Sequence, residues 1–269
     1  MRYWFDYLPK KVNINTLDRL EYTNEQLIEN NKNYEERFIF DKFKNYELSR
    51  KTYNYFQRNL GKKTTFFIAS SWGWVEFFLS KNFSLIASDV GEKYVNFHKD
   101  NEHLKYIKFD ILNISENKEY NNKFEQVVIN DIVHLFDQDQ IRKCIKNIHN
   151  ITKEDADVFF IFRSRDSFLI KIIDNYLSPF ENKLKTILKN FKKDKWYFTK
   201  NHHGFRRSEK EFIKIIEEGD FKVQSIYRDM FEVEYNNLTI IRMLKISKFL
   251  SSIFLKSHPH LNIFHIKKK

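Results

Sequence analysis

The chain contains little cysteine, glycine and proline. Among its 269 residues there are one cysteine, five glycines and three prolines. The single cysteine, Cys144, excludes an internal disulfide and any cysteine-based zinc site, and it fits a reducing compartment. No stretch approaches the roughly 18–20 consecutive apolar residues of a membrane span, and the first residues lack the apolar core of a signal peptide. We therefore expect a cytoplasmic protein without a transmembrane segment.

Aromatic and basic residues are abundant instead. The chain has 28 phenylalanines, and 47 lysines and arginines outnumber 36 acidic residues, which gives a net charge of +11. Hydrophobic residues make up 42% and charged residues 31%, a balance typical of a globular protein rather than a disordered one. The positive charge favours anionic partners such as nucleic acid or nucleotide-linked substrates. Because it is spread along the chain, it equally fits a basic solvated surface with no specific partner.

Short apolar runs alternate with amphipathic segments, and these patterns predict strands and helices respectively. The predicted strands are 64–69, 83–89, 105–111, 124–131, 157–162, 221–229 and 238–246, and the predicted helices include 92–100, 137–151 and 206–221. Ser208 and Glu211 have the spacing of a capping box, and Gly219 is the predicted stop of the same helix. Repeated strand–helix units imply an α/β fold with a doubly wound, seven-stranded, mostly parallel sheet, which ends in a C-terminal antiparallel strand pair.

Other segments flank or interrupt this predicted core. Residues 1–60 have helical spacing and form an N-terminal extension, while the α/β domain spans 61–246 with a basic, aromatic helical insertion at about 166–203. The tail 247–269 is apolar with a basic end. We expect it to pack as a helix on the domain or on a second subunit, or else to bind anionic lipid.

Acidic residues follow several predicted strands, at the edge where a doubly wound sheet binds ligands. The strand ends carry Ala69 to Gly73, Asp89, Asp110, and Asn130 with Asp131. Asp89 lies twenty residues after Ala69, which is the spacing of an acid that accepts hydrogen bonds from both hydroxyls of a ribose. This edge is therefore predicted to bind a nucleoside.

Residues 64–162 resemble the core of the class I S-adenosylmethionine-dependent methyltransferases. Ala69, Ser71 and Gly73 fall on the three glycines of that family's first loop, Asp89 on its ribose-binding acid, Asp110 on its adenine-side acid and "NDIVHLF" on its motif after strand four. In the dinucleotide pattern Gly-x-Gly-x-x-Gly the last glycine would fall on Trp74, so the register favours S-adenosyl-L-methionine over NAD. Phe67 stands where the family has an acid.

The resemblance implies S-adenosyl-L-methionine as the cofactor and assigns ten residues to its site. They are Ala69, Ser70, Ser71, Trp72, Gly73, Asp89, Val90, Asp110, Ile111 and Asn130. Small residues at 69 and 71 let the backbone approach a ligand, though without easy access to positive φ. The serine hydroxyls are expected to bind the methionine carboxylate, and Trp72 or Trp74 to cover the sulfonium by cation–π attraction. The alternative is a loop that has lost its cofactor, in which the tryptophans fill the space.

Histidine, aspartate and arginine side chains near the same edge are candidate catalytic and substrate-binding groups. The catalytic candidates are His134, His203 and Asp131, and the substrate-binding candidates are Arg163 and Arg165. Methyl transfer to a hydroxyl needs a general base, which a histidine can supply, and arginine can hold a phosphate or carboxylate bidentately. The alternatives are structural histidines, Asp131 as a turn cap, and arginines paired with Asp166 or with an acid at the sheet edge. No metal site is expected.

We predict a methyltransferase that acts on a small-molecule acceptor. The loop "NDIV" lacks the Pro-Pro-aromatic pattern of enzymes that methylate DNA base amines, and no glutamate pair brackets a hairpin as in protein-arginine methyltransferases. Family analogy favours a saccharide, a nucleotide-linked sugar or another anionic metabolite as acceptor, in glycan biosynthesis. The alternatives are an RNA methyltransferase, given the charge of +11, and a non-catalytic methyltransferase-like domain that binds or assembles through the tail.

Overall fold

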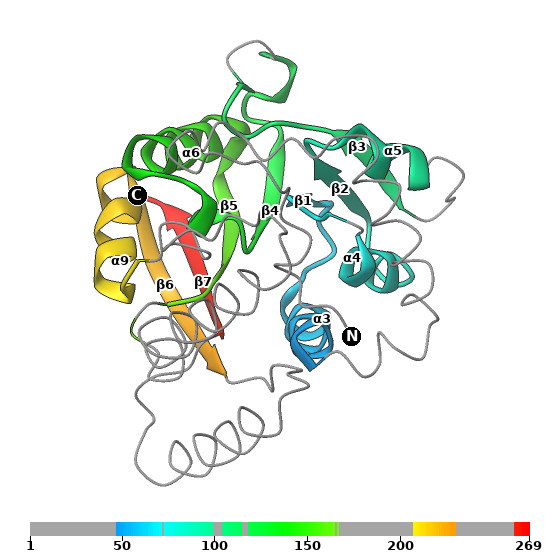
Figure 1. Cartoon of the computed structure of the whole chain (residues 1–269), viewed down its shortest axis with the longest axis horizontal. Helices are drawn as coiled ribbons and strands as arrows, with labels where there is room; N and C mark the ends of the chain where they lie inside the picture. The colour runs from blue at the N-terminus through cyan, green and yellow to red at the C-terminus, as the bar shows by residue number, and fades with distance from the viewer. Residues whose placement is uncertain are drawn as a thin grey trace, which may run out of the picture.

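A seven-stranded sheet forms the centre of the protein. The computed structural model describes residues 47–71, 73–98, 104–114, 118–164, 166, 207–229 and 261–269. The strands are β1 (Thr65–Ile68), β2 (Leu85–Asp89), β3 (Lys105–Lys108), β4 (Phe124–Asn130), β5 (Thr152–Phe162), β6 (Phe221–Asp229) and β7 (Leu261–Lys268). Their order in the sheet is β3-β2-β1-β4-β5-β7-β6 (Figure 1). β1 to β5 pair in parallel, whereas β7 is antiparallel to both β5 and β6. The predicted α/β architecture is confirmed.

Helices connect the strands and cover the sheet. They are α3 (Glu47–Asn59), α4 (Trp74–Leu79), α5 (Glu92–His98), α6 (Gln138–Ile151) and α9 (Glu209–Glu218), with 3-10 turns η3 (Lys118–Tyr120) and η4 (Val133–Leu135). The predicted capping box of α9 is confirmed, because Ser208 accepts from the Glu211 amide and the Glu211 side chain accepts from the Ser208 amide. Gly219 caps the other end of this helix, as predicted. No helix in the described ranges is long and apolar enough to cross a membrane.

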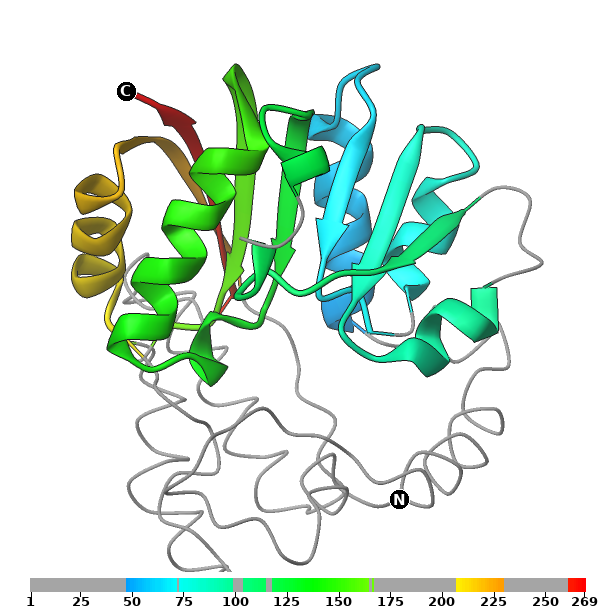
Figure 2. The same ribbon diagram turned by 90° about the horizontal axis from the view of Figure 1, so that it is seen from above.

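Strand side chains alternate between two hydrophobic clusters, one on each face of the sheet. In β1, Phe66 and Ile68 join the cluster beneath α6 and α9, whereas Phe67 joins the cluster beneath α3 and α4. Turning the molecule shows helices on both sides of the strands (Figure 2). This alternation follows from the period of two in a strand, and it produces the three-layer arrangement of a doubly wound sheet.

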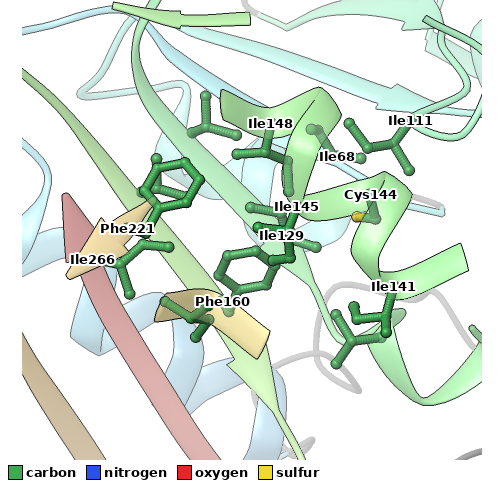
Figure 3. Packing of buried hydrophobic residues seen from close by; sticks show 14 of the residues in the cluster. Ile68, Ile111, Ile129, Ile141, Cys144, Ile145, Ile148, Phe160, Phe221 and Ile266 are labelled. Carbon is green, nitrogen blue, oxygen red and sulfur yellow. The ribbon is translucent and has the colours of Figure 1, made fainter. Parts of the chain in front are cut away.

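The apolar face of α6 packs directly on the sheet. Ile141, Cys144, Ile145 and Ile148 lie on the side of the helix that faces the strands, where Ile129 and Phe160 are labelled (Figure 3). Cys144 is fully buried there, and burial raises the pKa of its thiol far above the ordinary value. The predicted position of Cys144 on the core face of this helix is confirmed, and the thiol is a packing group.

The last strand comes from a different part of the chain than predicted. The predicted strand at 238–246 lies outside the described residues, and the strand that pairs with β6 is β7. β7 lies between β5 and β6, and Leu261, Ile263 and Phe264 are fully buried. The prediction of a packing helix or lipid anchor is therefore wrong for 261–268. The alternating apolar residues of "LNIFHIKK" favour a strand, but the basic end of the chain obscured this pattern.

α3 extends the core beyond the predicted start of the α/β domain. Phe56 is fully buried and makes an edge-to-face contact with Phe67 at 5.7 Å between ring centroids. The end of the predicted N-terminal extension is thus part of the packed domain. The remaining boundaries, including the insertion at about 166–203, stay predictions, because most of those residues lie outside the described ranges.

Candidate cofactor and active site

Sheet register brings the predicted cofactor residues to one edge. Ile68, the last residue of β1, pairs with Ser88 on one side and with Ile129 on the other. The residues that follow these positions therefore emerge together at the carboxyl edge. They are Ala69, Asp89 and Asn130. The chain turns to opposite sides of the sheet after β1 and β4, so this edge is the topological switch point at which ligands bind in such folds.

The loop after β1 has the backbone of a glycine-rich turn although it contains one glycine. Ala69, Ser71 and Gly73 have φ values of 62°, 51° and 63°. All three lie in the left-handed region, which costs an ordinary residue about 1–2 kcal/mol and a glycine almost nothing. The small side chains at 69 and 71 thus retain the conformation of the family's glycines, which was not expected from the sequence. Strained residues of this kind cluster at ligand sites.

Asp89 closes this loop onto β2. Its Oδ2 accepts a hydrogen bond from the Ser71 amide at 2.9 Å, and its Oδ1 accepts one from the Gly91 amide at 3.1 Å. Tyr106 on β3 donates its hydroxyl hydrogen bond to the Ser71 carbonyl, and burial raises the pKa of this tyrosine well above its ordinary value. Val90, the next predicted cofactor residue, is exposed at this edge.

The segment after β3 contributes one polar group and one core residue. Oδ1 of Asp110 accepts from the Leu112 amide at 2.9 Å, so the carboxylate caps its own turn. The Ile111 side chain is buried in the cluster under α6 (Figure 3). Its carbonyl accepts a hydrogen bond from the Asn147 side chain at 2.6 Å. A contact between Ile111 and a cofactor would therefore involve its backbone rather than its side chain.

An ion-pair chain joins the ends of β4 and β5. Oδ2 of Asp131 lies 2.5 Å from Nη2 of Arg163, and Oδ1 lies 3.6 Å from Nδ1 of His134 in η4. Asp131 also has a left-handed backbone, with a φ of 48°. The structure therefore brings these three predicted residues together. It pairs Arg163 with an acid at the sheet edge, which was the structural alternative to its predicted binding of substrate.

Two further residues of this edge were missed by sequence reasoning. Arg207, just before α9, is 7% exposed and donates to the carbonyls of Val133, Phe136 and Asp137 at 3.0, 2.7 and 2.9 Å. It therefore holds the backbone around η4, which contains His134. Burial lowers the pKa of this guanidinium. No local signal distinguishes Arg207 from neighbouring basic residues, because its partners are about seventy positions earlier in the chain.

The second missed residue is Glu76, in the first turn of α4. Its side chain is 1% exposed, and burial raises the pKa of the carboxyl to about 7. The charge of Asp89 acts in the same direction, whereas the nearby Ser70 and Asn130 side chains favour the charged form. The sequence signal was a single acid in the apolar stretch "WVEFFL".

The remaining predicted groups divide between residues outside the described ranges and residues of the core. Trp72, Arg165 and His203 lie outside the described residues, as does the Trp74 side chain. Phe67, where the resembling family has an acid, is buried in the cluster under α3 and α4. Among the described residues, no group of three or more histidine, cysteine, aspartate or glutamate side chains is arranged to hold a metal ion.

Comparison with known proteins identifies the fold. Neither protein-family models nor curated protein sequences give a match. Many solved structures do. A possible histamine N-methyltransferase from Thermotoga maritima has a TM-score of 0.57 and 12% identity, with 88% of this chain and 95% of that chain covered. A TehB-like methyltransferase from Corynebacterium glutamicum has a TM-score of 0.52 and 10% identity, with 90% and 100% covered.

A third similar structure, a SAM-dependent methyltransferase from Archaeoglobus fulgidus, has a TM-score of 0.50 and 15% identity, with 82% of this chain and 94% of that chain covered. At these identities the likeness concerns the fold. It agrees with the strand order and with the antiparallel β7. The chain therefore has the class I methyltransferase fold.

Proposed function

We propose that this chain is an S-adenosylmethionine-dependent methyltransferase that acts on a small-molecule acceptor. The observation that carries the proposal is the loop 69–73. Its three left-handed residues occupy the three glycine positions of the family pattern, and its Ser71 amide is bonded to the acid that ends β2. Backbone strain at Ala69 and Ser71 is not expected in a loop that had lost its cofactor, because strained residues persist mainly at functional sites.

The groups at this edge fit the proposed cofactor. Asp89 would accept hydrogen bonds from the ribose hydroxyls, since a carboxylate has about four acceptor sites and can bind hydroxyls together with backbone amides. Buried polar atoms of Ser70 in the loop and of Glu76 next to it would meet a polar ligand there. Asp110 and Asn130 complete the proposed set. The bound cofactor would supply a methyl group already activated by its sulfonium.

The chain's own residues would then position the acceptor and accept its proton. We assign the general base to His134, whose Nδ1 faces Asp131, so that Nε2 is the nitrogen that takes the proton from an acceptor hydroxyl. The Asp131 carboxylate lies beside the imidazole, and Arg163 holds that carboxylate in place. Arg207 is a positioning residue, because it fixes the backbone of the turn around His134.

The finer assignment of the acceptor rests on analogy. A saccharide or nucleotide-linked sugar in glycan biosynthesis remains our proposal, and a second copy of the chain is a proposed partner. One structure with a similar fold is described as a possible histamine N-methyltransferase, which supports a small acceptor. Arg163 and Arg165 stay the proposed contacts for an anionic group of the acceptor. For Arg163 this requires the substrate to compete with Asp131.

Calorimetric titration with S-adenosylmethionine and S-adenosylhomocysteine tests the proposal. We expect both to bind the wild-type protein, and Asp89→Asn to weaken both by about tenfold or more, since it removes a charged acceptor. The matched control is Asp155→Asn, an exposed acid near the opposite end of β5. Thermal unfolding of both variants separates loss of a ligand contact from loss of folding. Absence of binding to either compound at millimolar concentration would remove the proposal.

A further inference from the structure

Glu76 is a buried carboxyl for which the described residues provide no cation. Its side chain is 1% exposed, and its Oε1 has no hydrogen-bond partner within the described ranges. None of the ion pairs found among those residues includes it. Burying a charged carboxylate without a cation costs much free energy. A protein therefore keeps such a group where a ligand supplies the cation or where the carboxyl stays protonated.

The surroundings of Glu76 belong to the cofactor edge. Ser70 lies in the loop after β1 and Asn130 ends β4, and both side chains are close enough to lower the pKa of the Glu76 carboxyl. Asp89, which holds the loop through the Ser71 amide, is the nearby charge that raises it. The Oγ of Ser70 is a second buried polar atom without a partner in the described part of the chain. Ser70 and Asn130 offer neutral hydrogen-bonding groups to the Glu76 carboxyl, but no ion pair among the described residues balances its charge at the switch point of the sheet.

Strand β1 contributes no acid to this edge of the sheet. In the resembling family an acid precedes the first loop, but Phe67 points into the core beneath α3, where it contacts Phe56. Strand β1 thus contributes no carboxylate to the loop. Glu76 lies in the first turn of α4, the helix that begins after Gly73, and its carboxyl interacts with Ser70 of the loop and with Asp89. The helix provides the acid that the strand lacks.

We propose that the Glu76 carboxylate binds the α-ammonium group in the aminoacyl part of the cofactor; this inference rests on the proposed function. An ammonium carries three N–H donors and a positive charge, and it would meet the buried oxygen atoms Glu76 Oε1 and Ser70 Oγ. Its positive charge would offset the mutual repulsion of Glu76 and Asp89. The assignment gives this chain a cofactor contact at a position that the glycine-loop pattern does not contain.

Two ligands separate the ammonium contact from the rest of the site. S-adenosylhomocysteine carries the aminoacyl group, whereas 5′-methylthioadenosine has the same nucleoside and sulfur without it. We expect Glu76→Gln to weaken S-adenosylhomocysteine binding by about 10- to 100-fold, the range for a hydrogen bond to a charged group, and to change 5′-methylthioadenosine affinity by less than about twofold. Glu92→Gln is the matched control, because Glu92 is an exposed acid in the first turn of the neighbouring helix α5. It should leave both affinities unchanged.

The outcomes distinguish this inference from the proposed function. If the wild type binds neither ligand, the proposed function fails and the Glu76 assignment fails with it. If the wild type binds S-adenosylhomocysteine and Glu76→Gln binds it equally well, the Glu76 assignment is overturned while the proposed function stands. If Glu76→Gln weakens the binding of both ligands equally, the Glu76 assignment is also overturned, because Glu76 would then act only on the shape of the loop.

A measurement on the wild type keeps the test independent of whether Glu76→Gln folds. Near pH 6 a carboxyl with a pKa of about 7 is mostly protonated, so binding an ammonium should release a proton. Among the described residues, the ionisable groups that interact with it are Asp89 and Tyr106. Because both ligands carry the same nucleoside, any effect of these two groups should be common to both. Calorimetry in buffers of different ionisation enthalpy should detect proton release with S-adenosylhomocysteine and none with 5′-methylthioadenosine. Equal release with both would overturn the assignment.

Discussion

The backbone amide of Ser71 donates a hydrogen bond of 2.9 Å to Oδ2 of Asp89. This bond ties the loop after β1 to the end of β2. Because Ser71 has a φ of 51°, the bond also holds a residue in a conformation that serine rarely adopts. The acid that we assign to the ribose hydroxyls therefore fixes the shape of the loop beside it, so the ligand site and the local fold depend on the same carboxylate.

Replacing Ala69 with glycine should stabilise the protein. Ala69 has a φ of 62°, so glycine removes about 1–2 kcal/mol of backbone strain, of which about 0.4–1 kcal/mol is offset by the greater freedom of glycine in the unfolded chain. We expect the free energy of unfolding to rise by about 0.5–1 kcal/mol for Ala69→Gly, as measured by denaturant titration. Ser71→Gly should behave in the same way.

Ala156→Gly is the matched control for this measurement, because Ala156 is buried in β5 and is not among the residues with positive φ. Glycine in a strand destabilises by about 0.5–1 kcal/mol relative to alanine. The two substitutions should therefore have opposite signs. Destabilisation by Ala69→Gly as large as that by Ala156→Gly would contradict the left-handed conformation of the loop.

Arg207→Met should destabilise the protein by about 2–3 kcal/mol. The guanidinium donates to three carbonyls around η4, and its removal takes a charged donor from each of them, although the Val133 and Asp137 carbonyls keep a backbone hydrogen bond. Arg142→Met is the control, since Arg142 is half exposed and its contact with Glu218 is 3.4 Å long, so a change within about 0.5 kcal/mol is expected. Denaturant titration of both variants checks this, and equal effects would show that Arg207 does not hold the turn.

The Glu76 carboxyl should make the stability of the unliganded protein depend on pH. Its pKa is about 7 in the folded state and near 4.5 in the unfolded chain, so between these values the folded state holds a proton that the unfolded state has lost. Stability from this group is thus fully present below about pH 4.5 and is lost as the pH rises through 7. Glu76→Gln, which mimics the protonated form, should unfold at higher denaturant concentration than wild type at pH 8 and at a similar concentration at pH 4.5.

Asp89 and Tyr106 interact electrostatically with Glu76 and remain in both proteins, so the difference between wild type and Glu76→Gln isolates the one carboxyl. A constant difference across this pH range would mean that Glu76 does not titrate there. A variant that is less stable at pH 8 would mean that its carboxylate is already paired in the unliganded protein.

His134→Gln should separate binding from turnover. We expect S-adenosylhomocysteine affinity to change by less than about twofold, because His134 follows β4 and is not assigned to the cofactor, while methyl transfer falls by about 10²-fold or more. Single-turnover assays with a confirmed acceptor measure the second quantity. The control is His149→Gln, near the end of α6 that leads into the amino-terminal end of β5. Turnover that survives His134→Gln would assign the base elsewhere.

Local patterns predicted most of the fold correctly. Alternating and continuous apolar runs predicted β1 to β6 correctly. A strand that is buried on one or both faces of a sheet carries this pattern in its own residues. β7 was misplaced because its partner β5 is about a hundred residues earlier, and a strand pattern at the chain end does not reveal where it inserts. The capping box of α9 was predictable because its two residues are three positions apart.

The candidate site was less predictable than the fold, because it too depends on contacts between residues that are distant in the sequence. Asp89 and the loop 69–73 follow from spacing along the chain, but the left-handed backbone at Ala69 and the Ser71–Asp89 hydrogen bond are properties of the folded structure that spacing does not show. Glu76 and Arg207 depend on burial, which a sequence pattern does not show for a charged residue. Charged residues are rarely fully buried, so the expectation from sequence is an exposed side chain.

A crystal structure with S-adenosylhomocysteine bound would show whether the loop 69–73 forms the cofactor site. We expect the ligand to lie along this loop, with its ribose hydroxyls on Asp89 and its ammonium group on Glu76. A ligand bound away from this loop, or crystals grown at millimolar ligand in which the loop stays unliganded, would contradict the assignment of this edge as the cofactor site.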